Sequence, residues 1–301
     1  MFRLLPLLAA LGAAGLAQAN PQGFYRQPAV QGDTVVFVSQ GDLWRSSLAG
    51  GAAQRISSHA GQEISPVLLP DGKTVAFVAQ YESAGDVYTL SLAGGVPQRR
   101  TWLGTASVRV WGHDGQDGLL ITAPAEDGRQ LAQPYLLKGD KLQALPVGDA
   151  SDAAFSLDGR RIVFTRNGLR GDHAKNYRGG AIASLWVMEL GGSAEARPLL
   201  GADFPRANNR RPMPYRDAQG RERIAFLSDR DGFFNVWSVA ADGSDARQHT
   251  RFKDFDARQA SISGSTVVLA RGADLQRLDL NAPNADAPPA RRAGSRSRRT
   301  S

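Results

Sequence analysis

The chain has no cysteine among its 301 residues, so neither disulfides nor thiol chemistry contribute to its fold or function. It also lacks the Gly-x-Ser-x-Gly elbow of a serine nucleophile and the His-Glu-x-x-His pattern of a zinc enzyme. Beyond the N-terminus, no apolar run approaches the roughly 20 residues that span a bilayer. We therefore expect a core stabilised by apolar packing, no membrane span, and no catalytic residue, metal or cofactor in this chain.

Residues 1–19 have the pattern of a secretory signal peptide. Arg3 precedes an apolar run at residues 4–16, and Ala17-Gln18-Ala19 supplies small residues at the cleavage positions. The run has thirteen residues, which is too short for a membrane anchor. We expect cleavage after Ala19 and a periplasmic or secreted protein.

Positive charge is concentrated at the C-terminus. The net charge is +7, but residues 291–301 hold five arginines and no acidic residue. Without these arginines the charge falls to +2, and without Arg3 to +1. A nearly neutral body does not favour a specific nucleic-acid partner. We expect one domain at residues 20–281 and a Pro/Arg-rich disordered tail at residues 282–301.

Turn sequences recur at a regular spacing. Asp71-Gly72, Asp114-Gly115 and Asp158-Gly159 are 43 and 44 residues apart, and each leads into an apolar run. Gln219-Gly220 and Ser263-Gly264 continue the series. Because glycine tolerates the positive φ of tight turns, the pattern predicts repeated β-hairpins.

Each repeat contains four predicted strands joined by three hairpins. Radial packing of several such sheets buries both apolar faces of each, which is the β-propeller solution. A β-sandwich is the alternative, but it does not require a repeat of about forty residues. The repeats predict an all-β, six-bladed propeller with four-stranded blades at residues 24–58, 63–102, 106–147, 149–200, 208–250 and 256–281.

Aromatic residues occupy equivalent positions in the repeats. Trp44, Tyr88, Trp186 and Trp237 each lie in the third predicted strand, and we expect them to pack between blades. The last repeat has three predicted strands followed by the proline-rich stretch 281–289, which cannot continue a sheet. The sixth blade is therefore expected to be incomplete.

One segment is not explained by the repeat. Blade 4 carries a surplus of about 17 residues, mainly at 168–183. Long loops on a rigid scaffold tend to carry recognition, although a surface insertion without function is the alternative. The candidate binding residues in this insertion are Arg170, His173, Lys175, Tyr177 and Arg178.

The remaining polar motifs predict structure rather than chemistry. The four histidines, at positions 59, 113, 173 and 249, fall in different units, and we expect them to be solvated at the surface. The stretch Ser228-Asp-Arg-Asp-Gly232 could be taken for a calcium loop, but it lacks the closing Glu of an EF-hand. A turn with a capping aspartate is the preferred interpretation.

Four stretches together resemble one family. They are Gly23–Trp44, Leu69–Tyr81, Asn176-Tyr-Arg-Gly-Gly180, and the run from Phe226 to Gly232 with Asn235 and Asp254-Phe-Asp256. Over residues 23–281 the chain resembles the first, six-bladed propeller of tricorn-type serine proteases. The Asp-Gly-Lys/Arg element alone is less specific, because TolB-like propellers of the PD40 type share it.

The resemblance implies a non-catalytic module. Tricorn-type enzymes continue into a second propeller, a PDZ-like domain and a catalytic core, and no position here matches their catalytic residues. The implied role is to guide peptides or to serve as a scaffold in proteolysis, with peptides or a protein as partner and with oligomers possible. The switch to an arginine-rich end suggests that the chain is truncated by a frameshift or premature stop.

Two alternatives remain open at this point. One is a free-standing, TolB-like periplasmic propeller that binds proteins. The other is an enzyme in its own right, such as a lyase or hydrolase, which the lack of clustered histidines and carboxylates disfavours.

Overall fold

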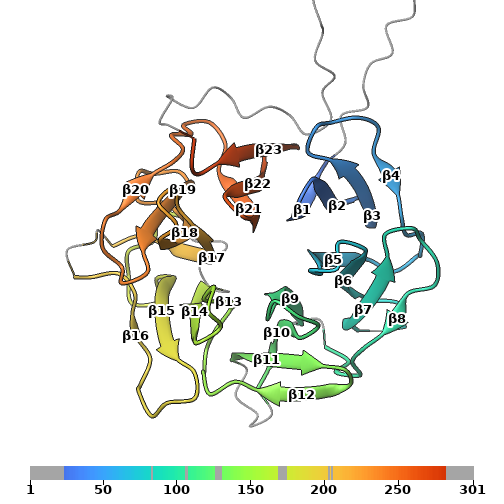
Figure 1. Cartoon of the computed structure of the whole chain (residues 1–301), viewed down its shortest axis with the longest axis horizontal. Helices are drawn as coiled ribbons and strands as arrows, with labels where there is room; N and C mark the ends of the chain where they lie inside the picture. The colour runs from blue at the N-terminus through green and yellow to red at the C-terminus, as the bar shows by residue number, and fades with distance from the viewer. Residues whose placement is uncertain are drawn as a thin grey trace, which may run out of the picture.

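The chain folds into six antiparallel sheets arranged as blades around a central axis (Figure 1). This is a computed structural model that describes residues 24–82, 84–105, 108–125, 131–168, 175–202, 204 and 206–282. Five blades have four strands and the sixth has three. The predicted all-β, six-bladed propeller with an incomplete sixth blade is therefore confirmed. In the part of the chain described, no helix is long and apolar enough to cross a membrane.

In all six blades the strands follow one another in chain order from the axis outward (Figure 1). Blade 1 contains β1 (Arg26–Gln31), β2 (Thr34–Ser39), β3 (Asp42–Ser47) and β4 (Gln54–Arg55), and blade 2 contains β5 (Glu63–Leu68), β6 (Thr74–Ala79), β7 (Asp86–Ser91) and β8 (Gln98–Arg99). Blade 3 contains β9 (Arg109–His113), β10 (Leu119–Pro124), β11 (Ala132–Lys138) and β12 (Lys141–Ala144), and blade 4 contains β13 (Asp152–Phe155), β14 (Arg161–Arg166), β15 (Ser184–Glu189) and β16 (Arg197–Pro198). Blade 5 contains β17 (Asn209–Arg216), β18 (Glu222–Ser228), β19 (Asn235–Ala240) and β20 (Arg247–Gln248), and blade 6 contains β21 (Ala257–Ser263), β22 (Thr266–Arg271) and β23 (Asp274–Asp279).

The antiparallel order gives the propeller two distinct faces. The first hairpin of every blade, and the third hairpin of each four-stranded blade, lie on one face, which we call the hairpin face. The second hairpins and the links between blades lie on the opposite face, which we call the connection face. The predicted Asp-Gly turns belong to the hairpin face, where Gly72 and Gly159 have φ values of 64° and 69°.

The apolar core lies between the blades rather than within one layer. Trp44 belongs to a cluster with Val268 and Leu275 of blade 6, so it packs against the blade that closes the ring. Trp237 lies in a cluster with Val163 of blade 4. Each aromatic of this series faces the preceding blade, as the sequence predicts.

A polar clamp recurs at the outer edge of the blades. Asp86 begins β7, and its Oδ1 accepts hydrogen bonds from Thr101 Oγ1 at 2.8 Å and from Leu103 N at 2.6 Å. In blade 5, Asn235 Oδ1 accepts a bond from Thr250 Oγ1 at 2.8 Å. These side chains hold the segment that follows the fourth strand against the third strand. The fourth strand therefore needs few backbone hydrogen bonds to its neighbour. Four of the five outer strands have only two residues, fewer than the repeat suggests.

Blade 6 loses little by ending after three strands. An outer strand of two residues adds only two residue pairs to its neighbour in blades 1, 2, 4 and 5. Beyond β23, Leu280 is buried in the core cluster that blades 5 and 6 share, and its N–H donates to Ser265 O at 2.9 Å. The chain is thus fastened to the propeller just past its last described strand.

Within the described part of the chain the ring closes without a shared strand, because every sheet is built from strands that are consecutive in the sequence. Side chains of β21 instead accept hydrogen bonds from the backbone of β1. The Oε1 atom of Gln259 accepts from Gln27 N at 2.7 Å, and Ser261 Oγ accepts from Val30 N at 3.2 Å. Ser263 Oγ accepts from the next free N–H, that of residue 32, at 3.1 Å. Three side chains therefore stand in for a strand ladder at the seam between the first and last blades.

This seam makes a testable prediction. Replacing Ser261 with Ala leaves the buried Val30 N–H unpaired and should lower the free energy of unfolding by about 1 kcal/mol. Urea denaturation followed by tryptophan fluorescence measures this change. Ser193→Ala, in an exposed turn of blade 4, is the control and should change stability by less than about 0.5 kcal/mol. Equal effects of the two changes would contradict the role of the seam.

Candidate binding site in the central channel

Five of the six inner strands are interrupted by β-bulges. A bulge inserts residues without a partner and redirects their side chains, and bulges are common beside functional sites. The unpaired positions are Gln27-Pro28 in β1, Ser65-Pro66 in β5, Trp111 in β9, Arg211-Pro212 in β17 and Arg258 in β21. With Asp152, the first residue of the regular strand β13, all of them except Pro212 line a common cavity around the axis.

Three of the bulges hold a non-glycine residue in the left-handed region directly before a proline. The φ values are 50° at Gln27, 53° at Ser65 and 60° at Arg211. Such conformations cost about 1–3 kcal/mol each and persist where the surroundings determine them. Here a side chain from the preceding blade accepts the exposed N–H: Gln27 Oε1 binds Ser65 N at 2.7 Å, and Asp152 Oδ1 binds Arg211 N at 3.1 Å.

The channel consists of two chambers. The chamber toward the connection face has a volume of about 240 Å³, and the chamber toward the hairpin face has a volume of about 740 Å³. Of the residues that the structure describes, only Trp111, Arg211 and Ala260 line both. These three residues therefore form the boundary between the chambers.

Arg211 reaches across this boundary from blade 5. Its Nε donates a hydrogen bond to Ala260 O in blade 6 at 2.8 Å. Its guanidinium carbon lies 4.7 Å from the ring centroid of Trp111 in blade 3. The Trp111 ring is itself held by a bond from Nε1 to Thr122 Oγ1 at 2.8 Å.

The chamber toward the connection face is rich in positive charge. Burial lowers the pKa of Arg211, and the negative charge of Asp152 opposes that shift. Burial raises the pKa of Asp152, which is the one acidic residue among those that line this chamber. Its lining includes four arginines, at positions 109, 210, 211 and 258. The arrangement favours an anionic ligand, because an incoming negative charge offsets the cost of burying these cations.

The predicted binding insertion serves as a brace. Arg170 and His173 lie outside the described residues. Lys175 Nζ is 3.0 Å from Asp256 Oδ1 of blade 6 and 3.7 Å from the ring centroid of Phe233 in blade 5. Tyr177 is partly exposed, with 40% of its surface accessible. The insertion therefore fastens blade 4 to both of the blades that follow it.

Asp229 is the main anchor of this insertion. Its carboxylate is fully buried and accepts hydrogen bonds from Asn176 N at 2.7 Å, Arg178 Nη1 at 3.1 Å and Asn208 Nδ2 at 2.8 Å. The predicted turn is present, since Gly232 N donates to Asp229 O at 2.9 Å. Two of the stretches that carry the family resemblance are thus in direct contact. Among the described residues, no group of three His, Asp or Glu side chains is placed to hold a metal ion.

Removing this anchor should loosen the insertion. Asp229→Ala leaves buried donors without an acceptor and should lower the free energy of unfolding by about 3 kcal/mol. Trypsin should then cleave after Arg178 faster under native conditions, which mass spectrometry of the fragments detects. Asp231→Ala, which removes an exposed carboxylate from the same turn, should leave both readouts nearly unchanged. Unchanged cleavage in Asp229→Ala would show that the anchor lies elsewhere.

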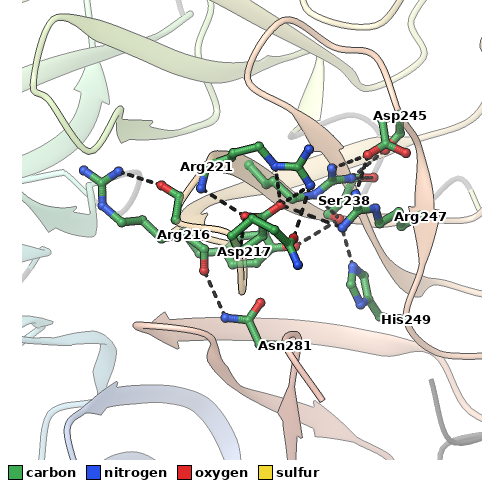
Figure 2. A network of polar contacts seen from close by, with 12 residues as sticks. Arg216, Asp217, Arg221, Ser238, Asp245, Arg247, His249 and Asn281 are labelled. Atoms are coloured by element: carbon green, nitrogen blue, oxygen red, sulfur yellow. Dashed lines mark hydrogen bonds and ion pairs between the residues drawn. The ribbon is translucent and has the colours of Figure 1, made fainter. Parts of the chain in front are cut away.

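Blade 5 contains a serine–histidine pair inside a polar network (Figure 2). His249 Nε2 lies 2.8 Å from Ser238 Oγ, and Ser238 is fully buried. Tyr215 Oη and Arg223 Nε also donate to this hydroxyl, at 3.2 and 3.3 Å. The expectation that the histidines are solvated is wrong for His249, because it directly follows the outer strand β20 and its ring faces the buried Ser238.

The acidic residues of this network are paired with arginines. Asp217 Oδ2 accepts two bonds from Arg221, and Asp245 Oδ2 accepts one from Arg223 at 2.7 Å (Figure 2). Among the described residues, no carboxylate bonds to His249. A catalytic triad needs a carboxylate that orients the histidine and an accessible serine, and this arrangement has neither.

The environment of His249 predicts a pH-dependent stability. Burial, and then the charges of Arg223 and Arg247, lower its pKa from 6.5 to about 4. In the unfolded chain His249 binds a proton below about pH 6.5, whereas in the folded chain it binds this proton only below about pH 4. This contribution to stability is therefore complete above pH 6.5 and is lost progressively between pH 6.5 and 4.

The role of His249 can be tested by comparing how steeply the free energy of unfolding changes with pH in different variants. In His249→Gln, the fall in unfolding free energy between pH 6.5 and 4 should be smaller by roughly 3 kcal/mol than in the unaltered protein. Urea denaturation at a series of pH values measures both slopes. His59→Gln, which removes an exposed histidine, is the control and should keep the original slope. Parallel slopes in all three proteins would contradict the assignment.

Sequence reasoning did not identify the channel residues. A signal was present, because a polar residue followed by proline begins the repeat at Gln27-Pro28, Ser65-Pro66 and Arg211-Pro212. The second and third strands of each repeat dominate its apolar pattern, so that pattern does not mark the start of the inner strand.

Comparison with known proteins places the propeller in a family. A family model described as the tricorn protease N-terminal β-propeller domain matches residues 22–284. The chain belongs to this family. Tricorn protease homolog 1 of Streptomyces coelicolor is 33% identical over 270 residues, which cover 88% of this chain and 24% of that protein. The chain thus spans about a quarter of the length of that relative.

A second relative has a different organisation. A protein of Sulfurisphaera tokodaii named as a putative tricorn-like protease N-terminal subunit is 28% identical over 164 residues. The match covers 53% of this tricorn-type propeller and 83% of that subunit.

Solved structures agree with the family. The crystal structure of the tricorn protease superposes with a TM-score of 0.74 at 25% identity, covering 88% of this chain and 27% of that one. A putative TolB from Agrobacterium tumefaciens superposes with a TM-score of 0.59 at 19% identity, covering 75% of this chain and 80% of that one, which shows a shared fold alone.

Proposed function

We propose that this chain is the non-catalytic N-terminal propeller of a tricorn-like serine peptidase, and that it receives or guides peptides through its central channel. The observation that carries this proposal is the ring of bulges, which turns five inner strands toward one arginine-lined cavity. Channels and cavities with a few convergent polar groups are typical of binding sites.

The catalytic residues are proposed to come from outside residues 24–282. The relative named as an N-terminal subunit supports an arrangement in which the propeller and the catalytic part are separate polypeptides. The signal pattern in residues 1–19 supports export to the periplasm, where this assembly would act.

A free-standing, TolB-like binding propeller is the second candidate. It is favoured by the likeness in fold to TolB. The braced insertion and the family match over the whole propeller favour the first proposal instead.

Activity-based labelling separates the two candidates. The chain carries an affinity tag in its own organism, is purified from the periplasm, and is treated with a fluorescent fluorophosphonate, which labels active serine hydrolases. We expect the label on a co-purifying polypeptide that cleaves short peptides, and none on the propeller itself.

Ser238→Ala serves as the control. It should leave the labelled partner and the peptidase activity unchanged, because Ser238 is buried. Label on the propeller that disappears in Ser238→Ala would contradict a non-catalytic role. A complete absence of any labelled partner would favour the TolB-like candidate.

A further inference from the structure

The boundary between the two chambers has the features of a selectivity element. Among the described residues the two cavities share Trp111, Arg211 and Ala260, and of these three Arg211 alone carries a charge. We propose that Arg211 is the selectivity residue of a peptide-binding constriction in the channel and that it favours acidic over basic peptide segments. This inference rests on the proposed peptide-guiding function and names the class of peptide.

The guanidinium retains capacity for a ligand. Its Nε is bonded to Ala260 O, whereas Nη1 and Nη2 make no hydrogen bond with the described residues. No ion pair links Arg211 to a carboxylate of those residues, although Asp152 binds its backbone N–H. A planar guanidinium with two available nitrogens matches the two oxygens of a Glu or Asp side chain.

The backbone of Arg211 is fixed while its side chain can respond. The bulge, Pro212 and the bond to Asp152 hold the main chain, so the position of the Cα atom is set by the fold. The guanidinium group is held by one hydrogen bond, to Ala260 O, and by its contact with the ring face of Trp111. An acidic side chain that enters the boundary can therefore draw the guanidinium from the ring without unfolding the blade.

The surrounding charges act in the same direction. Arg109, Arg210 and Arg258 line the chamber that leads to the boundary from the connection face, and Asp152 is the acidic residue of that lining. Each of these arginines has interactions of its own, including the contact of Arg258 with Asp256 at 3.2 Å. Their combined field in a narrow cavity still attracts an acidic segment and repels a basic one.

Peptide binding to the purified chain tests the proposal. Two nonapeptides, one rich in Glu and one rich in Lys, carry fluorescein at the N-terminus and an amide at the C-terminus, so that no terminal carboxylate contributes. Fluorescence anisotropy at low ionic strength should show the acidic peptide binding about tenfold more tightly.

Substitutions locate the preference. Arg211→Gln should reduce the preference to about twofold or less, and Arg211→Lys should restore part of it, because it keeps the charge without the planar fork. Arg277→Gln removes the same charge from an exposed position on β23 and should leave the preference unchanged. Equal losses in Arg211→Gln and Arg277→Gln, or a full preference in Arg211→Gln, would overturn the proposal.

Two further readouts exclude a purely structural role. Binding of the acidic peptide should change tryptophan emission, and this change should vanish in Trp111→Phe while binding persists. Because the chain has no cysteine, Ser65→Cys places a single thiol in the smaller chamber. The acidic peptide should protect it from a thiosulfonate reagent, whereas a thiol from Ser193→Cys, in a turn of blade 4, should remain unprotected.

The outcomes distinguish this proposal from the proposed function. If neither peptide binds, or if the peptide protects both thiols equally, Arg211 is not a selectivity residue. The labelled peptidase partner is measured independently, so its presence would leave the tricorn-like role intact, and its absence would not erase a measured preference.

Discussion

The closure of the ring is the constraint on which the rest of this propeller depends. Every blade buries its faces against two neighbours, so an open seam would expose apolar surface on both blade 1 and blade 6. Among residues 24–282, as far as they are described, no strand crosses this seam. It is held by the apolar cluster of Val30, Phe37 and Leu275 and by polar side chains of β21 that bind the backbone of β1. Stability at the seam thus comes from side chains, which can separate without breaking a sheet.

The same hydrogen bonds connect ring closure to the channel. Gln259 accepts the N–H of Gln27 at the seam, and the side chain of Gln27 in turn accepts the N–H of Ser65 in blade 2. Asp152 performs the equivalent task for Arg211 on the other side of the ring. The bulges are therefore stable only when neighbouring blades are in place. In physical terms, the strained backbone that lines the channel is stabilised by the assembled ring rather than by local sequence.

The repeat predicted the blades well because hairpin turns and apolar alternation are local signals. The spacing of Asp71-Gly72 and Asp158-Gly159 was enough to place blades 2 and 4, since all strands of each lie within the predicted ranges 63–102 and 149–200. Burial of His249 could not be read in this way, since it depends on Arg223 and Ser238 from two other strands. The channel residues were missed for the same reason: a bulge is defined by the register of two strands, which a single strand's sequence does not contain.

The insertion of blade 4 stays a predicted binding segment, but its described cations already have partners. Lys175 and Arg178, both candidate binding residues, form ion pairs with Asp256 and Asp229 of the following blades. A cation already paired with a buried carboxylate has little capacity left for a ligand, because its release would leave a buried carboxylate without a partner. Arg211 is in the opposite situation, with a fixed backbone and no ion pair to the described residues. This contrast between Arg211 and the two paired cations of the insertion is the physical reason to seek the function of this propeller in its channel.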